Sequence, residues 1–225
     1  MAAQITTALV DALGGAGQVQ VDAGHNASRV SIRPQDHGAG GHYRVATVTG
    51  ATVSIGAAGI IASLSMPLTA GVLVLKRLSY TAVINTTVTT GTVMDAQAFV
   101  FRGGGTVASG GTAVALTLQK NKNSMATSFI RDFRVASTSA VTATGSKTND
   151  TNPFGAGTFT VPSLTVAGSG SATLELYKAD TAGQHEIVLG PTEGIEVQIR
   201  TAGPVTGSVL YYSIWEWVEL ASGSY

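Results

Sequence analysis

The sequence predicts an all-β fold, an antiparallel β-sandwich of jelly-roll-like form with a short N-terminal arm or helix. Many short segments after residue 17 alternate apolar and polar residues, and clusters of Gly, Asn, Asp and Ser separate them. No apolar pattern of helical period long enough to connect parallel strands follows residue 17. We therefore expect the sheets to be mainly antiparallel.

The first 17 residues have a different pattern. Four apolar residues recur at i, i+4, i+5 and i+8 before two glycines, namely Ile5, Leu9, Val10 and Leu13. This spacing favours one short amphipathic helix that ends at a glycine. A helix this short is marginal alone, so we expect it to lie on its own domain or to reach a neighbouring subunit. The expected organisation is an arm at 1–17 and one sandwich domain at 18–225.

The remaining chain contains period-two segments that we expect to form strands. In chain order these segments are Gln18–Asp22, Arg29–Ile32, His42–Thr49, Ala62–Met66, Val72–Val83, Ala96–Arg102, Ala113–Gln119, Phe129–Thr138, Thr158–Val166, Ala172–Lys178, Glu186–Leu189, Gly194–Arg200 and Val209–Leu220. Two stretches, Val72–Leu75 and Tyr211–Val218, are apolar on both faces. Such a strand either lies between two packed layers or turns one face toward another subunit.

The composition excludes several classes of protein. Only 12% of the 225 residues are charged, against roughly 25% in ordinary soluble domains. The net charge of zero argues against a protein that packages nucleic acid. The absence of cysteine excludes a disulfide scaffold and a thiolate metal site. A weakly charged surface favours self-association, so we expect a homo-oligomer.

The sequence predicts no membrane segment and no signal peptide. No run reaches the 18 or more apolar residues that span a bilayer. No Lys or Arg precedes Arg29, so the basic start of a signal peptide is missing. We expect the protein to be made, and to assemble, in the cytoplasm of the cell that produces it.

The sequence contains little that indicates catalysis, and we expect neither an enzymatic activity nor a cofactor. The chain has no Gly-x-Ser-x-Gly elbow and no phosphate-binding glycine loop. Two carboxylate pairs, Glu193 with Glu196 and Glu216 with Glu219, are local in sequence, and the second pair points to opposite faces of one strand. A glycosidase needs two carboxylates across a cleft, which this spacing does not establish.

One cluster of polar residues precedes the predicted strand His42–Thr49 and includes its first three residues. It consists of His25, Asn26, Arg29, Ser31, Arg33, Gln35, Asp36, His37, His42, Tyr43 and Arg44. A metal site would use His37, His42 and Asp36, but the spacing matches no common site. Alternatively, Arg33 and Arg44 pair with Asp36 around a glycine-rich turn. A third possibility is a subunit contact through Arg33, Tyr43 and Arg44, because Arg and Tyr are common at interfaces.

The closing strand, Val209–Leu220, carries both Trp residues. Tyr211, Ser213, Trp215, Trp217 and Glu219 share one face. The other face is more aliphatic, so we predict that it fills the core and that its Glu216 lies near an edge or pairs with an Arg. We expect Trp215, Trp217 and Tyr211 to lie at a subunit interface.

A short motif, Ser31-Ile32-Arg33-Pro34-x-Asp36-x-Gly38 followed by Gly41-x-Tyr43-Arg44, resembles structural proteins of tailed-bacteriophage virions. The Ala/Thr/Gly-rich strands and the closing aromatic strand are similar in style. The resemblance implies a virion component on the capsid surface, a decoration or cement protein that forms trimers and binds the major capsid protein. It carries over no functional residues. The alternative is a tail-fibre or receptor-binding module that recognises glycans.

Overall fold

The computed structural model describes most of the second part of the chain and four short strands near its start. The described residues are 8–10, 16–18, 21–22, 27–28, 41–52, 55–69, 71–104, 106–116, 127–143, 145–163, 171–179 and 186–220. The chain divides into two compact units, residues 1–35 and residues 36–225. Among the described residues, no helix has the length and apolar character needed to cross a membrane.

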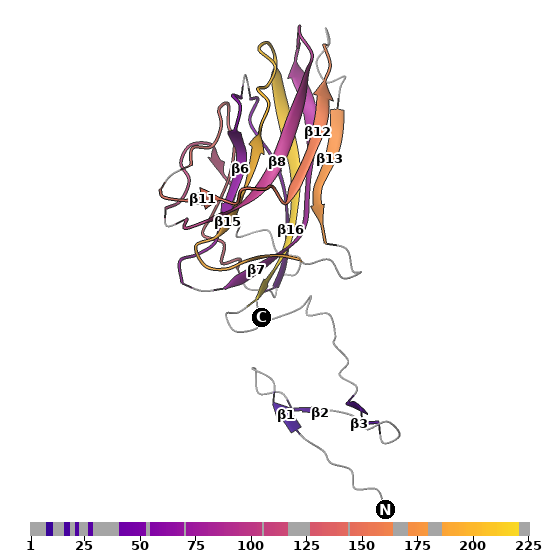
Figure 1. Cartoon of the computed structure of the whole chain (residues 1–225), viewed down its shortest axis with the longest axis vertical. Coiled ribbons are helices and arrows are strands. Elements are labelled where there is room, and N and C mark those ends of the chain that lie inside the picture. The colour runs from indigo at the N-terminus through magenta and orange to yellow at the C-terminus, as the bar shows by residue number, and fades with distance from the viewer. Residues whose placement is uncertain are drawn as a thin grey trace, which may run out of the picture. The chain divides into compact units, whose positions relative to one another are not determined.

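The N-terminal unit contains two small antiparallel sheets (Figure 1). One pairs β1 (Ala8–Val10) with β2 (Ala16–Gln18), and the other pairs β3 (Val21–Asp22) with β4 (Ala27–Ser28). The predicted helix is therefore wrong, because its centre forms β1. Four apolar residues are too few to separate a helical period from a strand.

Three predictions concern this region: two strands and the boundary between the arm and the sandwich domain. The predicted strand Gln18–Asp22 is interrupted, because Gln18 ends β2 while Val21–Asp22 form β3. The expected boundary between residues 17 and 18 falls inside β2, whereas the division by contacts falls after residue 35. The predicted strand Arg29–Ile32 lies outside the described residues.

The second unit is a β-sandwich of two antiparallel sheets, as predicted. The seven-stranded sheet has the order β11-β8-β15-β6-β10-β9, with β12 also paired to β8. Its strands are β6 (Gly59–Ser65), β8 (Thr92–Arg102), β9 (Thr112–Ala113), β10 (Asp132–Val135), β11 (Thr148–Asn149), β12 (Gly155–Val161) and β15 (Gly194–Ile199).

The five-stranded sheet has the order β13-β7-β16-β5, with β14 also paired to β7. Its strands are β5 (Gly41–Val48), β7 (Val72–Thr86), β13 (Ser171–Lys178), β14 (Ile187–Leu189) and β16 (Ser208–Leu220). Every strand pair in both sheets is antiparallel. Figure 1 shows the long strands β7, β8 and β16 within the sandwich.

The strand order is nested. In the five-stranded sheet β5 pairs with β16, the last strand of the chain, and in the other sheet β6 pairs with β15, the strand before it. Successive strands β5, β6, β7 and β8 alternate between the two sheets. A chain folded back on itself in this way closes a sandwich with distant segments side by side. The jelly-roll part of the fold prediction stays a prediction.

Most predicted strands match an observed strand, with shifted ends. The Asn- and Gly-containing stretch at 149–157, which no predicted strand includes, gives a short loop, because β11 ends at Asn149 and β12 begins at Gly155. The predicted strand Phe129–Thr138 shrinks to β10, and of the described residues in the predicted strand Ala113–Gln119, Ala113 alone belongs to β9. Flanking glycines and polar residues did not indicate these ends, since pairing partners determine where a ladder stops.

The core lies between the two sheets. Alternate residues of β15 point inward, and Ile195, Val197 and Ile199 are fully buried there. The opposite layer contributes Tyr43 from β5 and Trp215 from β16. Trp215 packs edge-on against Phe133 of β10, with ring centres 5.0 Å apart. These aromatic contacts join strands of the two different sheets.

The two sheets approach closely at one edge, where β12 passes β13. A Cβ atom at Gly155 would lie 2.1 Å from the backbone oxygen of Leu176. Only glycine allows this separation, because any larger side chain would overlap that oxygen. Gly155 therefore lets β12 cover the side of the core next to β13.

Candidate interaction surface

The predicted interface residues of β16 are buried in the core. Tyr211, Trp215 and Trp217 are each exposed by 1% or less. The assignment of the two faces is therefore wrong: the Trp face fills the core, and Tyr212 on the opposite face is 46% exposed. Side chains enclosed within one chain offer no surface to a second subunit.

Polar partners on the same face explain why both Trp residues can be buried. The Trp215 Nε1–H donates to Ser213 Oγ at 3.0 Å, and the Trp217 Nε1–H donates to Glu219 Oε1 at 2.9 Å. Each acceptor lies two residues from its Trp, on the same side of the strand. A buried indole with a satisfied N–H contributes its full apolar area without leaving a donor unpaired.

The other predicted interface residues have mixed positions. Tyr43 is buried, and its ring stacks on Trp217 with centres 5.6 Å apart. Burial, with a smaller contribution from nearby Glu219, raises the pKa of Tyr43 to about 12. Arg44 is exposed, and its Nε lies 3.4 Å from Glu216 Oε1. The predicted pairing of Glu216 with an arginine is confirmed, and Arg33 lies outside the described residues.

Glu219 is a carboxylate enclosed in the sandwich. It accepts hydrogen bonds from the Trp217 indole, the Ser128 hydroxyl and the Phe129 N–H, the last at 3.0 Å. Burial raises its pKa, and these hydrogen bonds oppose that rise only in part. The carboxylate fastens the segment at 127–131 to the end of β16.

The four carboxylates of the two pairs bind partners on several different segments. Glu193 accepts from Arg102 and from the Gly190 N–H, and Glu196 accepts from Lys147, which directly precedes β11. Glu216 lies on the outer face of β16, whereas Glu219 is inside, so the prediction that they face opposite ways is confirmed. Each of these carboxylates holds neighbouring segments together.

The predicted metal ligands are only partly described. His42 lies half-buried on β5, whereas Asp36 and His37 lie outside the described residues. The described part of the chain contains no group of three or more His, Cys, Asp or Glu residues able to hold a metal ion. A small hollow beside Pro162 and Ala172 has a volume of about 10 Å³, the room of a single water molecule.

The chain covers much of the outer face of the seven-stranded sheet with its own residues. Ile60 of β6 packs beneath Ala108 and Val141, which come from the long connections between strands. On β8 and β15, Phe101 and Glu196 are buried beneath Lys147. Hydrogen bonds from Asn149 and Gln198 to Glu196, both 3.2 Å long, complete this cluster.

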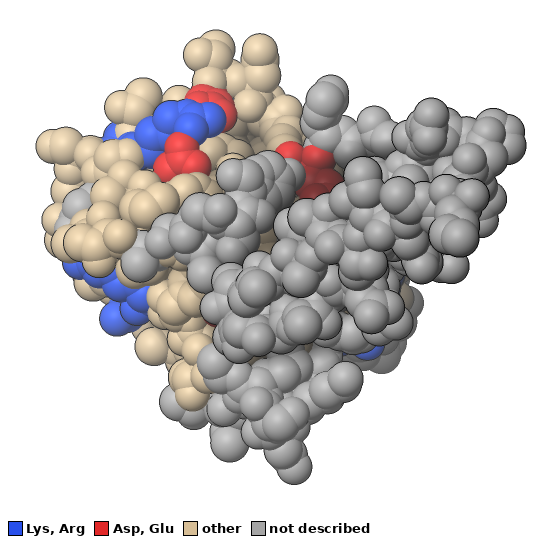
Figure 2. All heavy atoms as spheres, turned by 90° about the horizontal axis from the view of Figure 1, so that it is seen from below, with Lys and Arg blue, Asp and Glu red and all other residues tan. Residues whose placement is uncertain are grey.

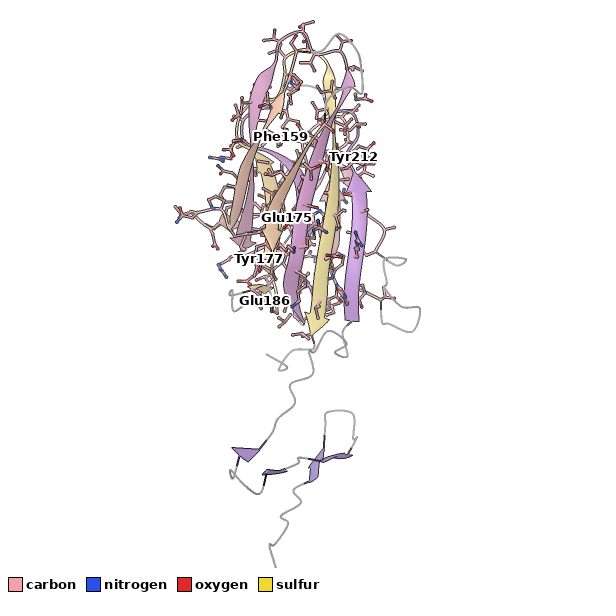
Figure 3. The ribbon with its side chains drawn as sticks, turned by 90° about the vertical axis from the view of Figure 1, so that its right-hand side faces the viewer. Phe159, Glu175, Tyr177, Glu186 and Tyr212 are labelled. Carbon is pink, nitrogen blue, oxygen red and sulfur yellow. The ribbon has the colours of Figure 1, made fainter. Side chains whose placement is uncertain are left out.

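The outer face of the five-stranded sheet is different, because apolar side chains there remain exposed. In the part of the chain that the structure describes, five large hydrophobic residues are exposed, and two of them, Val48 and Tyr212, are directly opposite each other on β5 and β16. Figure 3 shows this side of the sheet, with Tyr212 and Glu175 labelled on it. We call this outer face the open face; its exposed or half-buried residues include Arg44, Ala46, Val48, Arg77, Thr81, Thr173, Glu175, Tyr212, Ile214 and Glu216.

Charged groups occupy a small share of the described surface, as Figure 2 shows for one end of the molecule. On the five-stranded sheet they form ion pairs between neighbouring strands. Lys76 pairs with Glu186, and the Arg77 Nη2 lies 3.2 Å from Glu175 Oε2. Sequence reasoning missed the open face, since it assigned the even-numbered residues of β16 to the core.

Comparison with known proteins adds no relative. No family model, no curated protein and no solved structure matches the chain.

Proposed function

We propose that this chain is a non-enzymatic virion structural protein of a tailed bacteriophage, a decoration or cement protein on the capsid surface. In this role it oligomerises and stabilises the head by binding major capsid subunits. The sequence motif that ends at Arg44 suggests the class, and the low charge supports a surface that copies or partners cover. Apart from Arg134 with Asp132 on β10, the described ion pairs join different segments of the sandwich, which fits a structural role.

The observation that carries the proposal is the division of the chain into a sandwich and a separate N-terminal unit. The described strands of that unit have two or three residues each and form two-stranded sheets. Such sheets are marginal in water. They gain stability when another protein surface adds backbone hydrogen bonds or covers their side chains. An arm that binds a neighbouring capsid subunit provides that surface.

Purified particles test this proposal. We expect the protein to co-purify with heads, separated from tails, in a constant ratio to the major capsid protein. Particles made without it should lose their genome at a lower temperature and recover when the purified protein is added. Presence on tails alone, or absence from particles, would overturn the proposal.

Exposed Tyr212 favours one alternative, a receptor-binding module of the virion. Its ring lies on a flat sheet, where aromatic side chains stack on sugars. The burial of Trp215 and Trp217 removes the two other rings that such a site would use. A glycan array distinguishes the two functions: binding that Tyr212→Ala abolishes would favour the receptor-binding module.

A further inference from the structure

A buried cluster on the outer side of the seven-stranded sheet brings an amine, a carboxylate and two carboxamides together. The side chains of Lys147 and Glu196 are 8% and 1% exposed, and Phe101 beside them is buried. Lys147 Nζ contacts Glu196 Oε1. The side-chain amides of Asn149 and Gln198 each donate to Glu196 Oε2 at 3.2 Å. One carboxylate thus holds a nucleophile next to groups that a nucleophile can attack.

The strand register places the Asn149 carboxamide, rather than that of Gln198, beside the lysine. Asn149 pairs with Phe101 of β8, and Lys147 precedes it by two residues on the same side of the chain. The lysine Nζ lies 4.4 Å from the centre of the Phe101 ring. Gln198 pairs with Gln97, four residues farther along β8, which corresponds to about 13 Å along the sheet. Asn149 is therefore the carboxamide within reach of the amine.

We propose that Lys147 and Asn149 join spontaneously in the folded chain, through an amide bond between Lys147 Nζ and Asn149 Cγ, with Glu196 as the proton carrier. This modification lies within the sandwich and goes beyond the proposed function. The ion pair between Lys147 and Glu196 is the starting state, and it persists in every chain that has not reacted.

The reaction balances without an external reagent. The Lys147 ammonium first gives one proton to the Glu196 carboxylate, and the neutral amine then attacks Asn149 Cγ to form a tetrahedral centre. Glu196 gives its proton to the departing Nδ2 of Asn149 and takes one from the attacking nitrogen. The Cγ–Nδ2 bond breaks with its electron pair on nitrogen, so ammonia leaves. The products are the new amide, a protonated Glu196 and one molecule of ammonia.

The surroundings favour each part of this reaction. Burial lowers the pKa of Lys147 to about 8, so its ammonium loses a proton more readily than that of an exposed lysine. Because both reacting groups contact one carboxylate, they are already held together, which lowers the entropic part of the barrier. The products contain a neutral amide and a neutral carboxyl group in place of two buried charges, whose desolvation is costly.

The bond would constrain the strand that contains Asn149. β11 has two residues, Thr148 and Asn149, and Lys147 directly precedes it. A covalent ring through both side chains closes over this strand and keeps the lysine stem above Phe101. Such a ring also reduces the conformational freedom of the unfolded chain, which stabilises the fold.

Mass spectrometry of the full chain tests the bond directly. Loss of one ammonia lowers the intact mass by about 17 Da. Trypsin cleaves after unmodified lysine, so the unreacted chain gives the peptides 135–147 and 148–178. The linked chain should instead give one peptide that spans 135–178, and fragmentation should locate the bond between Lys147 and Asn149. An assay of free ammonia should find one molecule released per chain.

Matched variants separate the roles of the three residues. Lys147→Arg keeps the positive charge without a nucleophilic amine, and Asn149→Ala removes the group that is attacked, so both should keep the full mass. Glu196→Gln keeps hydrogen-bonding atoms but cannot carry the proton, and it should slow bond formation at least about a hundredfold. Lys76→Arg changes a lysine of another ion pair and should still lose ammonia. Thermal melting by circular dichroism checks that each variant is folded.

Three results would overturn the proposal. The first is an unchanged mass in folded wild-type protein kept for several days at pH 8, near the pKa of Lys147. The second is a bond from Lys147 to a residue other than Asn149. The third is the same mass loss in Lys147→Arg, which would indicate a succinimide at Asn149 that opens at alkaline pH. Because no capsid particle is present, each of these results leaves the proposed function untouched.

Discussion

At the scale of single residues, the polar neighbours of the two tryptophans account for much of the core geometry. Ser213 and Glu219 accept the indole N–H groups from positions two residues away on the same strand. Glu219 also holds the segment before β10 through the Phe129 N–H. A few polar atoms thus allow the largest side chains of the protein to lie in its centre.

Trp215→Ala should destabilise the fold without acting at an interface. The ring packs against Phe133 and Tyr80, so its removal leaves a cavity in the core. We expect the free energy of unfolding to fall by about 3–5 kcal/mol, measured by urea titration. A lower oligomer mass with an unchanged unfolding midpoint would contradict the assignment of this residue to the core.

Glu219 should make stability depend on pH in a direction opposite to most carboxylates. Burial raises its pKa in the folded state above the ordinary 4.5. Below the ordinary value the carboxyl is protonated in both states and carries no penalty. As pH rises above 4.5, the carboxyl of the unfolded chain ionises before that of the folded chain. The stability that Glu219 contributes at low pH is therefore lost by the time the pH passes the folded-state pKa.

The comparison of wild type with Glu219→Gln isolates this effect. Urea unfolding of both proteins from pH 4 to pH 8 gives the difference in their unfolding free energies. We expect the advantage of wild type over the variant to shrink as pH rises. An advantage that grows with pH would mean that the three hydrogen bonds hold the pKa below its ordinary value.

At the scale of elements, a buried ion pair fastens a two-residue strand to the sandwich. Next to β11, Lys147 reaches Glu196 of β15 and lies 4.4 Å from the centre of the Phe101 ring. Burial lowers the pKa of Lys147 to about 8, while the carboxylate beside it favours the charged form. So short a strand contributes few ladder hydrogen bonds, and side-chain bonds supply the rest of its attachment.

Lys147→Met should therefore lower the free energy of unfolding more than the double variant Lys147→Met with Glu196→Gln. The single variant leaves a buried carboxylate without its cation, which costs about 3–5 kcal/mol of unfolding free energy. In Lys147→Met with Glu196→Gln no charge is buried, and Asn149 and Gln198 still have an oxygen to bind. We expect the double variant to recover most of the loss in a urea titration. Equal losses in both variants would show that packing, not charge, governs the site.

At the scale of the whole molecule, the protein consists of a sandwich that contains its own core and an N-terminal unit of short strands. Every described residue of the main hydrophobic cluster belongs to the sandwich. One outer face of the sandwich is largely covered by its own connections, and the other is open. In the proposed function, the N-terminal unit makes the contact with the capsid.

Deletion of residues 1–35 should leave the sandwich folded and remove the proposed binding to capsid particles. Because the described core residues all belong to the second unit, we expect the melting temperature to stay within about 3 °C of the full chain. Binding to capsid particles should decline strongly, as measured by co-sedimentation. A shortened chain that fails to fold would show that the N-terminal unit belongs to the core of the sandwich.

Local sequence determined the class of the fold. Alternation between apolar and polar residues located most strands, and the absence of long helical patterns predicted antiparallel pairing, which every observed strand pair obeys. The pairing of Glu216 with an arginine could also be predicted, because a half-buried carboxylate on a strand needs a cation nearby. The strand positions and the antiparallel pairing depend on residues close in the sequence, whereas Arg44, the partner of Glu216, comes from a distant strand.

Only the tertiary structure decided which face of β16 is buried. Period two separates Tyr211 and Trp215 from Tyr212 and Ile214, but it does not say on which side the second sheet packs. That choice depends on Phe133 and on the acceptors of both indoles, which long-range pairing brings together. The open face has the same origin, because a face remains exposed only when no other part of the chain returns to cover it.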